Sequence, residues 1–211
     1  MPFTPPTPQA LAIPGPAGAL EAKLEDPGTS PATRFGIVCH PHPVYGGTMD
    51  NKVVHTLARA MQELGAPTLR FNFRGAGASE GAFDDGRGEV DDLLAVARFA
   101  RERWPHAELW LAGFSFGAWV ALQAERRLAP TKLVTVAPPV GRFAGTTVDT
   151  PQTPWLLIQG DADEVVASAK VLAWAAALAP GPELAVLTGA GHFFHGRLHE
   201  LKDTVLRFLA G

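Results

Sequence analysis

From residue 33 onward the chain alternates short apolar runs with longer amphipathic segments, and this alternation restricts the possible folds more than any other feature. Short apolar runs bounded by turn residues indicate buried strands, whereas apolar residues every three to four positions indicate helices. Strands and helices in regular succession are typical of a parallel sheet that carries helices on both faces. The sequence therefore predicts an α/β fold.

The pattern also gives approximate bounds. The expected strands are 34–39, 67–73, 108–112, 132–137, 155–159 and 184–187, and the expected helices are 51–63, 88–103, 116–127, 165–178 and 197–209. Before them, segments 9–13 and 19–24 flank the turn-prone stretch 14–18 and predict an antiparallel hairpin. The result is a mostly parallel eight-stranded sheet whose first strands are antiparallel and whose later strands are joined by right-handed crossovers.

The segment between the expected strands 132–137 and 155–159 interrupts the alternation of strands and helices. Residues 138–154 contain prolines at both ends and have no helical period. The segment is too short to form a helical lid of any size. We therefore expect no cap domain, and an open groove at any site that this segment borders.

Composition narrows the class of protein. With 211 residues, 46% of them hydrophobic, the chain fits one domain over residues 1–211, with residues 1–31 as a proline-rich segment that contains the hairpin. The formal net charge is −3 and the basic residues are dispersed, which argues against a nucleic-acid partner. Cys39 is the only cysteine, so no intrachain disulfide can form.

No segment predicts a membrane association. The first residues have neither a basic start nor an apolar core of signal-peptide length, and no stretch reaches the ~20 apolar residues of a membrane span. A reduced, cytoplasmic location is the expectation, and the sequence does not indicate an oligomeric state.

The motif GFSFG at residues 113–117 lies between an expected strand and an expected helix. Glycines two residues on either side of a serine permit a sharp strand-to-helix turn that presents the hydroxyl. In this turn the backbone N–H of Phe116 lies at the helix N-terminus, where it can stabilise a negative oxygen. A serine that only caps the helix would not need both glycines, so we interpret Ser115 as a nucleophile.

A nucleophilic serine needs a base and an acid that orients the base, each on a later loop. The strand at 155–159 leads into Gly160-Asp-Ala-Asp-Glu, and we favour Asp163 as the acid, with Asp161 as the alternative. The strand at 184–187 leads into Thr188-Gly-Ala-Gly-His, which makes His192 the expected base. His195 and His199 are more typical of residues on the face of the last helix.

A second oxyanion donor is expected from the loop after the strand 34–39. Pro41 and Pro43 lack N–H groups, which favours the N–H of His42 and leaves Val44 and Tyr45 as alternatives.

These motifs resemble the α/β-hydrolase superfamily. The segments that carry the resemblance are HPHPVYGGTMDNKVV (40–54), FNFRGAGASEG (71–81), GFSFG, GDADEVV (160–166) and GAGHFF (189–194). They are most similar to small bacterial serine hydrolases that lack a cap. The resemblance implies a Ser115, Asp163 and His192 triad, no metal or other cofactor, and an esterase-like activity. Much of the superfamily has a glycine after the histidine that corresponds to His40, whereas this chain has Pro41.

Two other motifs invite different interpretations. His40 and His42 form an H-x-H pair, with His192 or His195 as a possible third metal ligand, but no carboxylate completes a ligand pattern and we expect no metal. The glycines at 75–81 do not match a dinucleotide-binding loop, and we expect Arg74 to pair with Glu80 across it. The pair 84–85 is expected to lie in a solvated turn, and the pair 91–92 is expected to supply charges in the first turn of a helix.

The function that follows is a serine hydrolase of carboxylic esters or thioesters acting on a small-molecule substrate. Tyr45, Phe114 and Phe193 are the candidate substrate-binding residues, because aromatic side chains near the site would favour an apolar acyl group. The alternatives are a peptidase or amidase with the same triad, and a non-catalytic binding module with the same fold.

Overall fold

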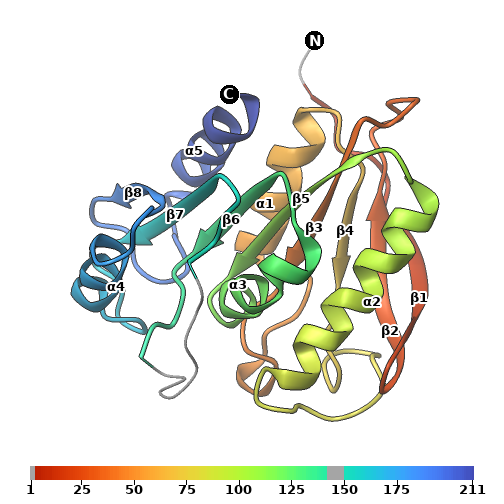
Figure 1. Ribbon diagram of the computed structural model, residues 1–211, viewed down its shortest axis with the longest axis horizontal. Coiled ribbons are helices and arrows are strands. Elements are labelled where there is room, and N and C mark those ends of the chain that lie inside the picture. The colour runs from red at the N-terminus through yellow and green to blue at the C-terminus, as the bar shows by residue number, and fades with distance from the viewer. Residues whose placement is uncertain (1–2, 142–149) are drawn as a thin grey trace.

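The computed structural model describes residues 3–141 and 150–211 (Figure 1). Eight strands form one sheet in the order β1-β2-β4-β3-β5-β6-β7-β8. The strands are β1 Gln9–Gly15, β2 Gly18–Glu25, β3 Arg34–Cys39, β4 Thr68–Phe71, β5 Glu108–Phe114, β6 Lys132–Val136, β7 Trp155–Gly160 and β8 Glu183–Leu187. β1 pairs antiparallel with β2, β2 pairs antiparallel with β4, and all other pairs are parallel. The predicted fold class is confirmed.

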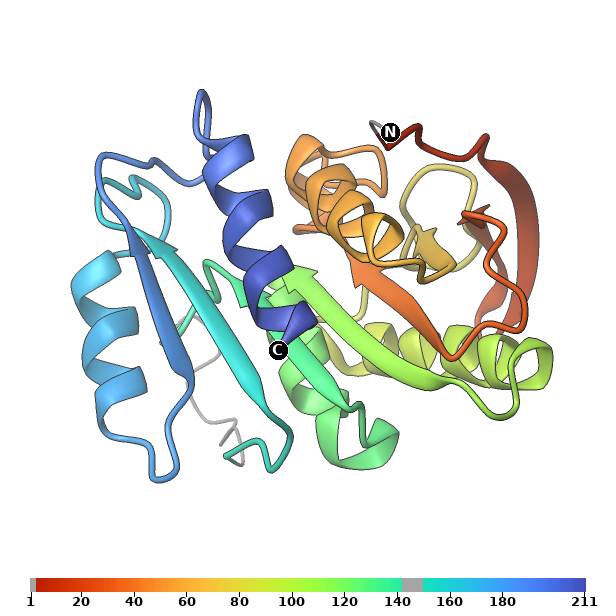
Figure 2. The ribbon, with the colours of Figure 1, turned by 90° about the horizontal axis from the view of Figure 1, so that it is seen from above.

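Helices cover both faces of the sheet, as Figure 2 shows from above. They are α1 Lys52–Glu63, α2 Arg87–Arg103, α3 Phe116–Leu128, α4 Ser168–Ala176 and α5 Leu198–Ala210, with a short 3-10 helix η1 at Pro43–Tyr45. α1 and α5 pack together on one face, and α2 and α3 pack together on the other face, where α4 also contributes to the core.

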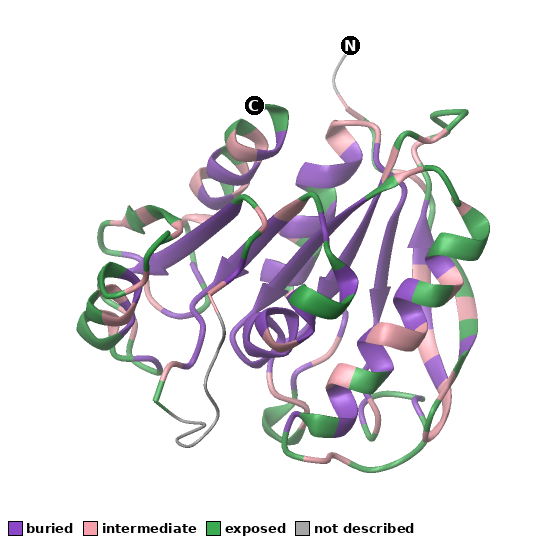
Figure 3. Ribbon diagram, in the orientation of Figure 1, coloured by how far each residue is buried: buried purple, intermediate pink, exposed green. Residues whose placement is uncertain are grey.

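Alternation along the central strands builds one hydrophobic core on each face. In β5, Leu109 and Leu111 lie in the core under α2, α3 and α4, whereas Trp110 and Ala112 lie in the core under α1 and α5. The period of two residues per repeat sends successive side chains to opposite faces. Figure 3 shows the result, with buried central strands and helices that are exposed on their outer sides.

Several expected bounds shift for local reasons. The helix expected from residue 165 begins at Ser168, because the N–H groups of Val165 and Val166 donate to the Asp163 carboxylate at 2.9 and 2.7 Å. The strand expected to reach Phe73 ends at Phe71, and the N–H of Phe73 donates to His40 Nε2 at 3.0 Å.

Two expectations about charged residues are wrong. Arg74 pairs with Asp92 on α2 at 2.7 Å rather than with Glu80, whose carboxylate accepts from the N–H of Ala19 at 2.6 Å. Asp91 and Asp92 lie beyond the first turn of α2, whose acidic residue is Glu89, and Asp92 is fully buried. The positive charge of the Arg74 guanidinium compensates the burial of the Asp92 carboxylate.

No helix within the described residues is long and apolar enough to span a membrane. Residues 142–149 of the segment 138–154 lie outside the described residues, and the open groove expected beside this segment stays a prediction. The described parts on either side hold no helix between β6 and β7.

Candidate active site

Ser115 lies on the turn from β5 into α3, at the carboxyl edge of the parallel strands. Its backbone has φ +53° and ψ −119°, a left-handed conformation that non-glycine residues rarely adopt. The N–H of Ser115 donates to Val136 O at 2.8 Å, which fixes the turn to the end of β6. Such strain at a reactive serine is typical of a turn that presents a nucleophile.

The two glycines of GFSFG are required by close backbone contacts. A Cβ atom on Gly113 would clash with the backbone of Gly117, and one on Gly117 would clash with the carbonyl of Cys39 at the end of β3. The spacing of the motif therefore reflects the close approach of the α3 backbone to the backbones of β5 and β3.

His192 joins Ser115 to an acidic residue. Its Nε2 atom lies 3.1 Å from Ser115 Oγ, and its Nδ1 atom lies 2.8 Å from Asp163 Oδ2. The imidazole is buried, and its backbone N–H donates to Glu164 Oε2 at 3.1 Å. The three side chains come from loops after β5, β7 and β8.

The Asp163 carboxylate is held on both oxygens. Oδ1 accepts from the N–H groups of Val165 and Val166, and Oδ2 accepts from His192 and, at 3.1 Å, from Gln159 Nε2. Burial raises the pKa of Asp163, but hydrogen bonds from His192 and from the two backbone N–H groups outweigh it and hold this pKa below its usual range. Asp163 is therefore ionised near neutral pH and can stabilise an imidazolium.

The alternative residues lie elsewhere. Asp161 accepts from the N–H of Gly189 at 2.6 Å and so ties the loop after β7 to the loop after β8. His199 lies on α5 with a largely exposed side chain, and the ring of His195 lies 6.0 Å from that of Phe193. The structure brings Asp163, and not Asp161, into contact with His192.

The loop between β3 and α1 lines the same cavity as Ser115 and His192. His42 precedes η1, and its carbonyl accepts from the N–H groups of Tyr45 at 3.2 Å and Gly47 at 3.0 Å. The N–H of Tyr45 is thus used within the loop, which removes it as an oxyanion donor. His42 lines the cavity beside Ser115, whereas Val44 is 63% exposed at the surface.

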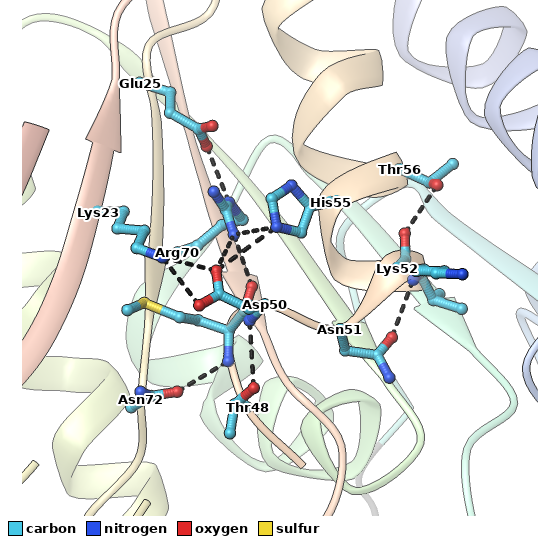
Figure 4. Close-up of polar contacts among 12 residues, drawn as sticks. Lys23, Glu25, Thr48, Asp50, Asn51, Lys52, His55, Thr56, Arg70 and Asn72 are labelled. Carbon is cyan, nitrogen blue, oxygen red and sulfur yellow. Dashed lines mark hydrogen bonds and ion pairs between the residues drawn. The ribbon is translucent and has the colours of Figure 1, made fainter. Parts of the chain in front are cut away.

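A polar network anchors the far end of this loop (Figure 4). Asn72 Oδ1 accepts from the N–H of Met49 at 2.8 Å, and Arg70 Nη1 donates to Met49 O at 2.7 Å. Arg70 also pairs with Glu25 at 2.8 Å, and both side chains are buried. The network ties the loop to β2 and β4 before α1 begins.

A cavity of about 330 Å³ opens beside Ser115. Its lining residues are Pro41, His42, Tyr45, Gly46, Gly47, Asn51, Ser115, Val165, His192 and Phe193. No Lys, Arg, Asp or Glu is among these lining residues. Tyr45, Val165 and Phe193 are partly exposed at its rim. The surface next to the hydroxyl is therefore mostly apolar and uncharged.

One expected substrate-binding residue lies outside the cavity. Phe114 is fully buried, and its ring centroid lies 5.0 Å from that of His192 and 5.9 Å from that of Phe193. It belongs to strand β5, whose alternation places it in the core under α1 and α5. Phe114 therefore packs against the imidazole and does not line the cavity, in contrast to Tyr45 and Phe193.

The H-x-H pair has a structural explanation at its first residue. His40 is fully buried, its Nδ1 lies 2.6 Å from Pro41 O, and its Nε2 accepts from the N–H of Phe73. Both ring nitrogens are used in hydrogen bonds, so neither is directed at a metal. Among the described residues, no three His, Cys, Asp or Glu side chains gather as a metal site requires.

Sequence reasoning missed two residues next to the site. Glu164 was only one of three acidic residues after β7, and Gln159 is an unremarkable polar residue within that strand. Its full burial, which the sequence does not reveal, distinguishes Gln159.

A mostly parallel sheet with a serine on the turn after β5, an acid after β7 and a histidine after β8 defines the α/β-hydrolase class of protein. Comparisons agree with this assignment. A family model described as serine aminopeptidase, S33, matches residues 44–147.

Solved structures and a curated relative match the chain over most of its length. The chain is similar to an α/β serine hydrolase without a lid from Xanthomonas campestris, with 43% identity, 100% of this chain and 97% of that chain covered, and a TM-score of 0.90. It is also similar to an α/β serine hydrolase homologue from Coxiella burnetii, with 44% identity, 98% and 99% covered, and a TM-score of 0.91. An uncharacterised protein of Rickettsia prowazekii is 34% identical over 205 residues, which cover 92% of this chain and 86% of the relative.

The chain belongs to the α/β-hydrolase superfamily. The similarity of the chain to serine hydrolases supports its assignment as a hydrolase.

Proposed function

We propose that this protein is a serine hydrolase that cleaves small, uncharged carboxylic esters or thioesters through an acyl-enzyme. The observation that carries the proposal is the position of the His192 ring, with Nε2 3.1 Å from Ser115 Oγ and Nδ1 2.8 Å from Asp163 Oδ2. These distances suit proton transfer from a hydroxyl to an imidazole that a carboxylate orients.

In the first half of the reaction, Ser115 Oγ attacks the carbonyl carbon while His192 Nε2 takes the hydroxyl proton. Asp163 stabilises the imidazolium. The tetrahedral oxyanion accepts hydrogen bonds from the N–H groups of Phe116, at the first position of α3, and of His42. The imidazolium then gives its proton to the departing alcohol or thiol, and Ser115 remains acylated.

In the second half, water replaces the alcohol or thiol. His192 Nε2 removes a proton from the water, whose oxygen attacks the acyl carbon. Collapse of the second tetrahedral intermediate returns the proton to Ser115 Oγ and releases the carboxylic acid. The free enzyme is restored, and no cofactor is needed for this sequence.

The cavity favours an uncharged, apolar acyl group. Pro41, Val165 and Phe193 offer carbon surface to the substrate, and no charged side chain is among the described lining residues. An ionised group in this cavity would lose water without gaining a partner of opposite charge. The proposed substrate is therefore a small neutral ester.

A peptidase or amidase is the alternative that shares the triad. The matching family model is described as serine aminopeptidase, but an aminopeptidase must bind the ammonium group of its substrate. A carboxylate is the usual partner for such a group, and none lines the described cavity. A binding module without activity would not require the strained backbone of Ser115.

Labelling with a fluorophosphonate and assays with p-nitrophenyl esters test the proposal. The wild-type protein is expected to take one label at Ser115, found by mass spectrometry of peptides. Ser115→Ala is expected to lose the label and about 10³-fold or more in kcat. Ser30→Ala, at an exposed serine, is the matched control. A wild-type protein without label, or equal activity in Ser115→Ala, contradicts the proposal.

A further inference from the structure

Gln159 is a buried amide next to the proposed triad. It is the fifth residue of β7, Trp155–Gly160, and its side chain is fully buried. The Nε2 atom donates to Asp163 Oδ2 at 3.1 Å and to Gly160 O at 3.1 Å. Asp163 Oδ2 is the same oxygen that faces His192 Nδ1. Gln159 therefore contacts the triad from a buried position on β7, outside the cavity lining.

The Oε1 atom of Gln159 is buried and has no hydrogen-bond partner within residues 3–141 and 150–211. Rotating the amide by half a turn would not help, because Oε1 would then face the carboxylate of Asp163 and the carbonyl of Gly160. Two acceptors thus fix the direction of the amide.

A fold selected only for stability has no use for this glutamine. Burying an unpaired amide oxygen destabilises a protein, whereas an apolar side chain of the same shape would fill the space without that penalty. A buried polar atom without a partner requires an explanation. The hydrogen bond to Asp163 is the one contact of Gln159 that reaches a residue of the proposed triad.

Four donors surround the Asp163 carboxylate. Val165 and Val166 hold Oδ1 through their backbone N–H groups, while Gln159 and His192 share Oδ2. Without Gln159, Oδ2 would keep only the imidazole, and the carboxylate could turn about the two bonds to Oδ1. The charge on Oδ2 would also be shared with one donor fewer.

We propose that Gln159 is a positioning residue that acts on His192 through Asp163. Its hydrogen bond holds Asp163 Oδ2 against His192 Nδ1. By sharing the negative charge of Oδ2, it also weakens the attraction of the carboxylate for the protonated imidazole. This inference rests on the proposed serine-hydrolase function. Gln159 is not among the described residues that line the cavity.

Gln159→Met tests the proposal, because methionine has a similar length and no N–H group. The variant is expected to be at least as stable as the wild type in urea unfolding. Its kcat on a p-nitrophenyl ester is expected to fall about tenfold, as for one lost hydrogen bond to a charged group. KM should stay unchanged, since the cavity is not altered.

The pH profile separates a positioning role from a structural one. With one donor fewer, the Asp163 carboxylate binds the imidazole proton more strongly, so the acidic limb of kcat/KM is expected to move to higher pH in Gln159→Met. The neighbouring carboxylates, Glu164 at the His192 N–H and Asp161 at the Gly189 N–H, are the same in both proteins.

Thr135→Val is the matched control. Thr135 is a fully buried polar residue on the adjacent strand β6, and its hydroxyl accepts from Trp155 Nε1 at 2.8 Å. This variant is expected to lose stability and to keep the wild-type pH profile, which is the opposite pattern.

Wild-type kcat and an unmoved pH profile in Gln159→Met overturn the proposal. Loss of folding in both Gln159→Met and Gln159→Leu also overturns it, because the glutamine would then serve stability. A wild-type protein without Ser115-dependent activity refutes the proposed function instead, so the two failures are distinguishable.

Discussion

Asn72 on the loop after β4 accepts a hydrogen bond from the backbone N–H of Met49, 23 positions earlier in the chain, at 2.8 Å. The same amide donates to Glu21 Oε2 at 2.7 Å, so it connects the loop between β3 and α1 to β2. This loop carries His42 on the wall of the cavity. We therefore expect the position of His42, the proposed second oxyanion donor, to depend on a residue outside the cavity.

Replacing Asn72 by alanine is expected to lower kcat/KM for a p-nitrophenyl ester about 10- to 100-fold, because a small displacement of an oxyanion donor weakens binding of the transition state. The free energy of unfolding should fall by about 1–3 kcal/mol, since the buried N–H of Met49 loses its acceptor. Thr48→Ala, which removes only a 3.4 Å contact to the Asp50 N–H, should change neither quantity appreciably. Unchanged kcat/KM in Asn72→Ala would show that the loop keeps its position without the amide.

Arg70 is a second anchor of the same loop, and its role in stability is measurable. Arg70→Met leaves the carboxylate of Glu25, which is 6% exposed, without its guanidinium partner. The variant is expected to lose about 3–5 kcal/mol of unfolding free energy, the range for breaking a buried ion pair on one side. Urea or thermal unfolding measures the loss.

The control for Arg70 is the exposed ion pair of the same network. Lys23 pairs with Asp50 at 2.8 Å with both side chains partly exposed. Lys23→Ala should therefore change stability by no more than about 1 kcal/mol. Equal losses of unfolding free energy in Arg70→Met and Lys23→Ala would contradict the expectation that the buried ion pair stabilises the protein more than the exposed one.

The sequence contains enough local information to predict the elements of this fold. Leu109 and Leu111 alternate with Trp110 and Ala112, and this period of two marks a strand that is buried on both faces. The strand order is not local, because it depends on which strands meet after collapse. The insertion of β4 between β2 and β3 was accordingly not predicted.

The candidate site divides in the same way. The motif around Ser115 and the loops after β7 and β8 were visible in the sequence, and the residues chosen from them lie together. Asn72, Gln159 and the Arg74–Asp92 pair depend on contacts that appear only after folding. Expecting Arg74 to pair with Glu80, its neighbour in sequence, was wrong for that reason.

The two aspartates after β7 are expected to behave differently. In Asp163→Asn, an amide N–H group facing His192 Nδ1 would favour the tautomer with a proton on Nε2, which cannot accept the proton of Ser115. A fall of about 10³-fold or more in kcat/KM is expected. Asp161→Asn should stay near the wild-type value, because its amide oxygen can still accept from the Gly189 N–H. The reverse order of effects would assign the acid to Asp161.

His40 should make stability depend on pH. Burial, with a smaller contribution from the nearby His42, lowers the pKa of His40 to about 4, although the hydrogen bond to Pro41 O opposes both effects. Between pH 4 and the ordinary value of about 6.5, the unfolded chain binds a proton at this residue that the folded protein does not. Unfolding therefore takes up protons in this window, and stability falls as the pH falls through it.

The variant His40→Gln removes this titration. Its free energy of unfolding is expected to decline less steeply than that of the wild type from pH 6.5 to 4, with a difference on the order of 3 kcal/mol over the window. His199→Gln, at a residue whose side chain is 71% exposed, should leave the slope unchanged. Chemical unfolding at several pH values measures the slopes. Parallel curves for His40→Gln and the wild type would mean that the buried imidazole gains its proton as readily as in the unfolded chain, against the cost of desolvating a cation.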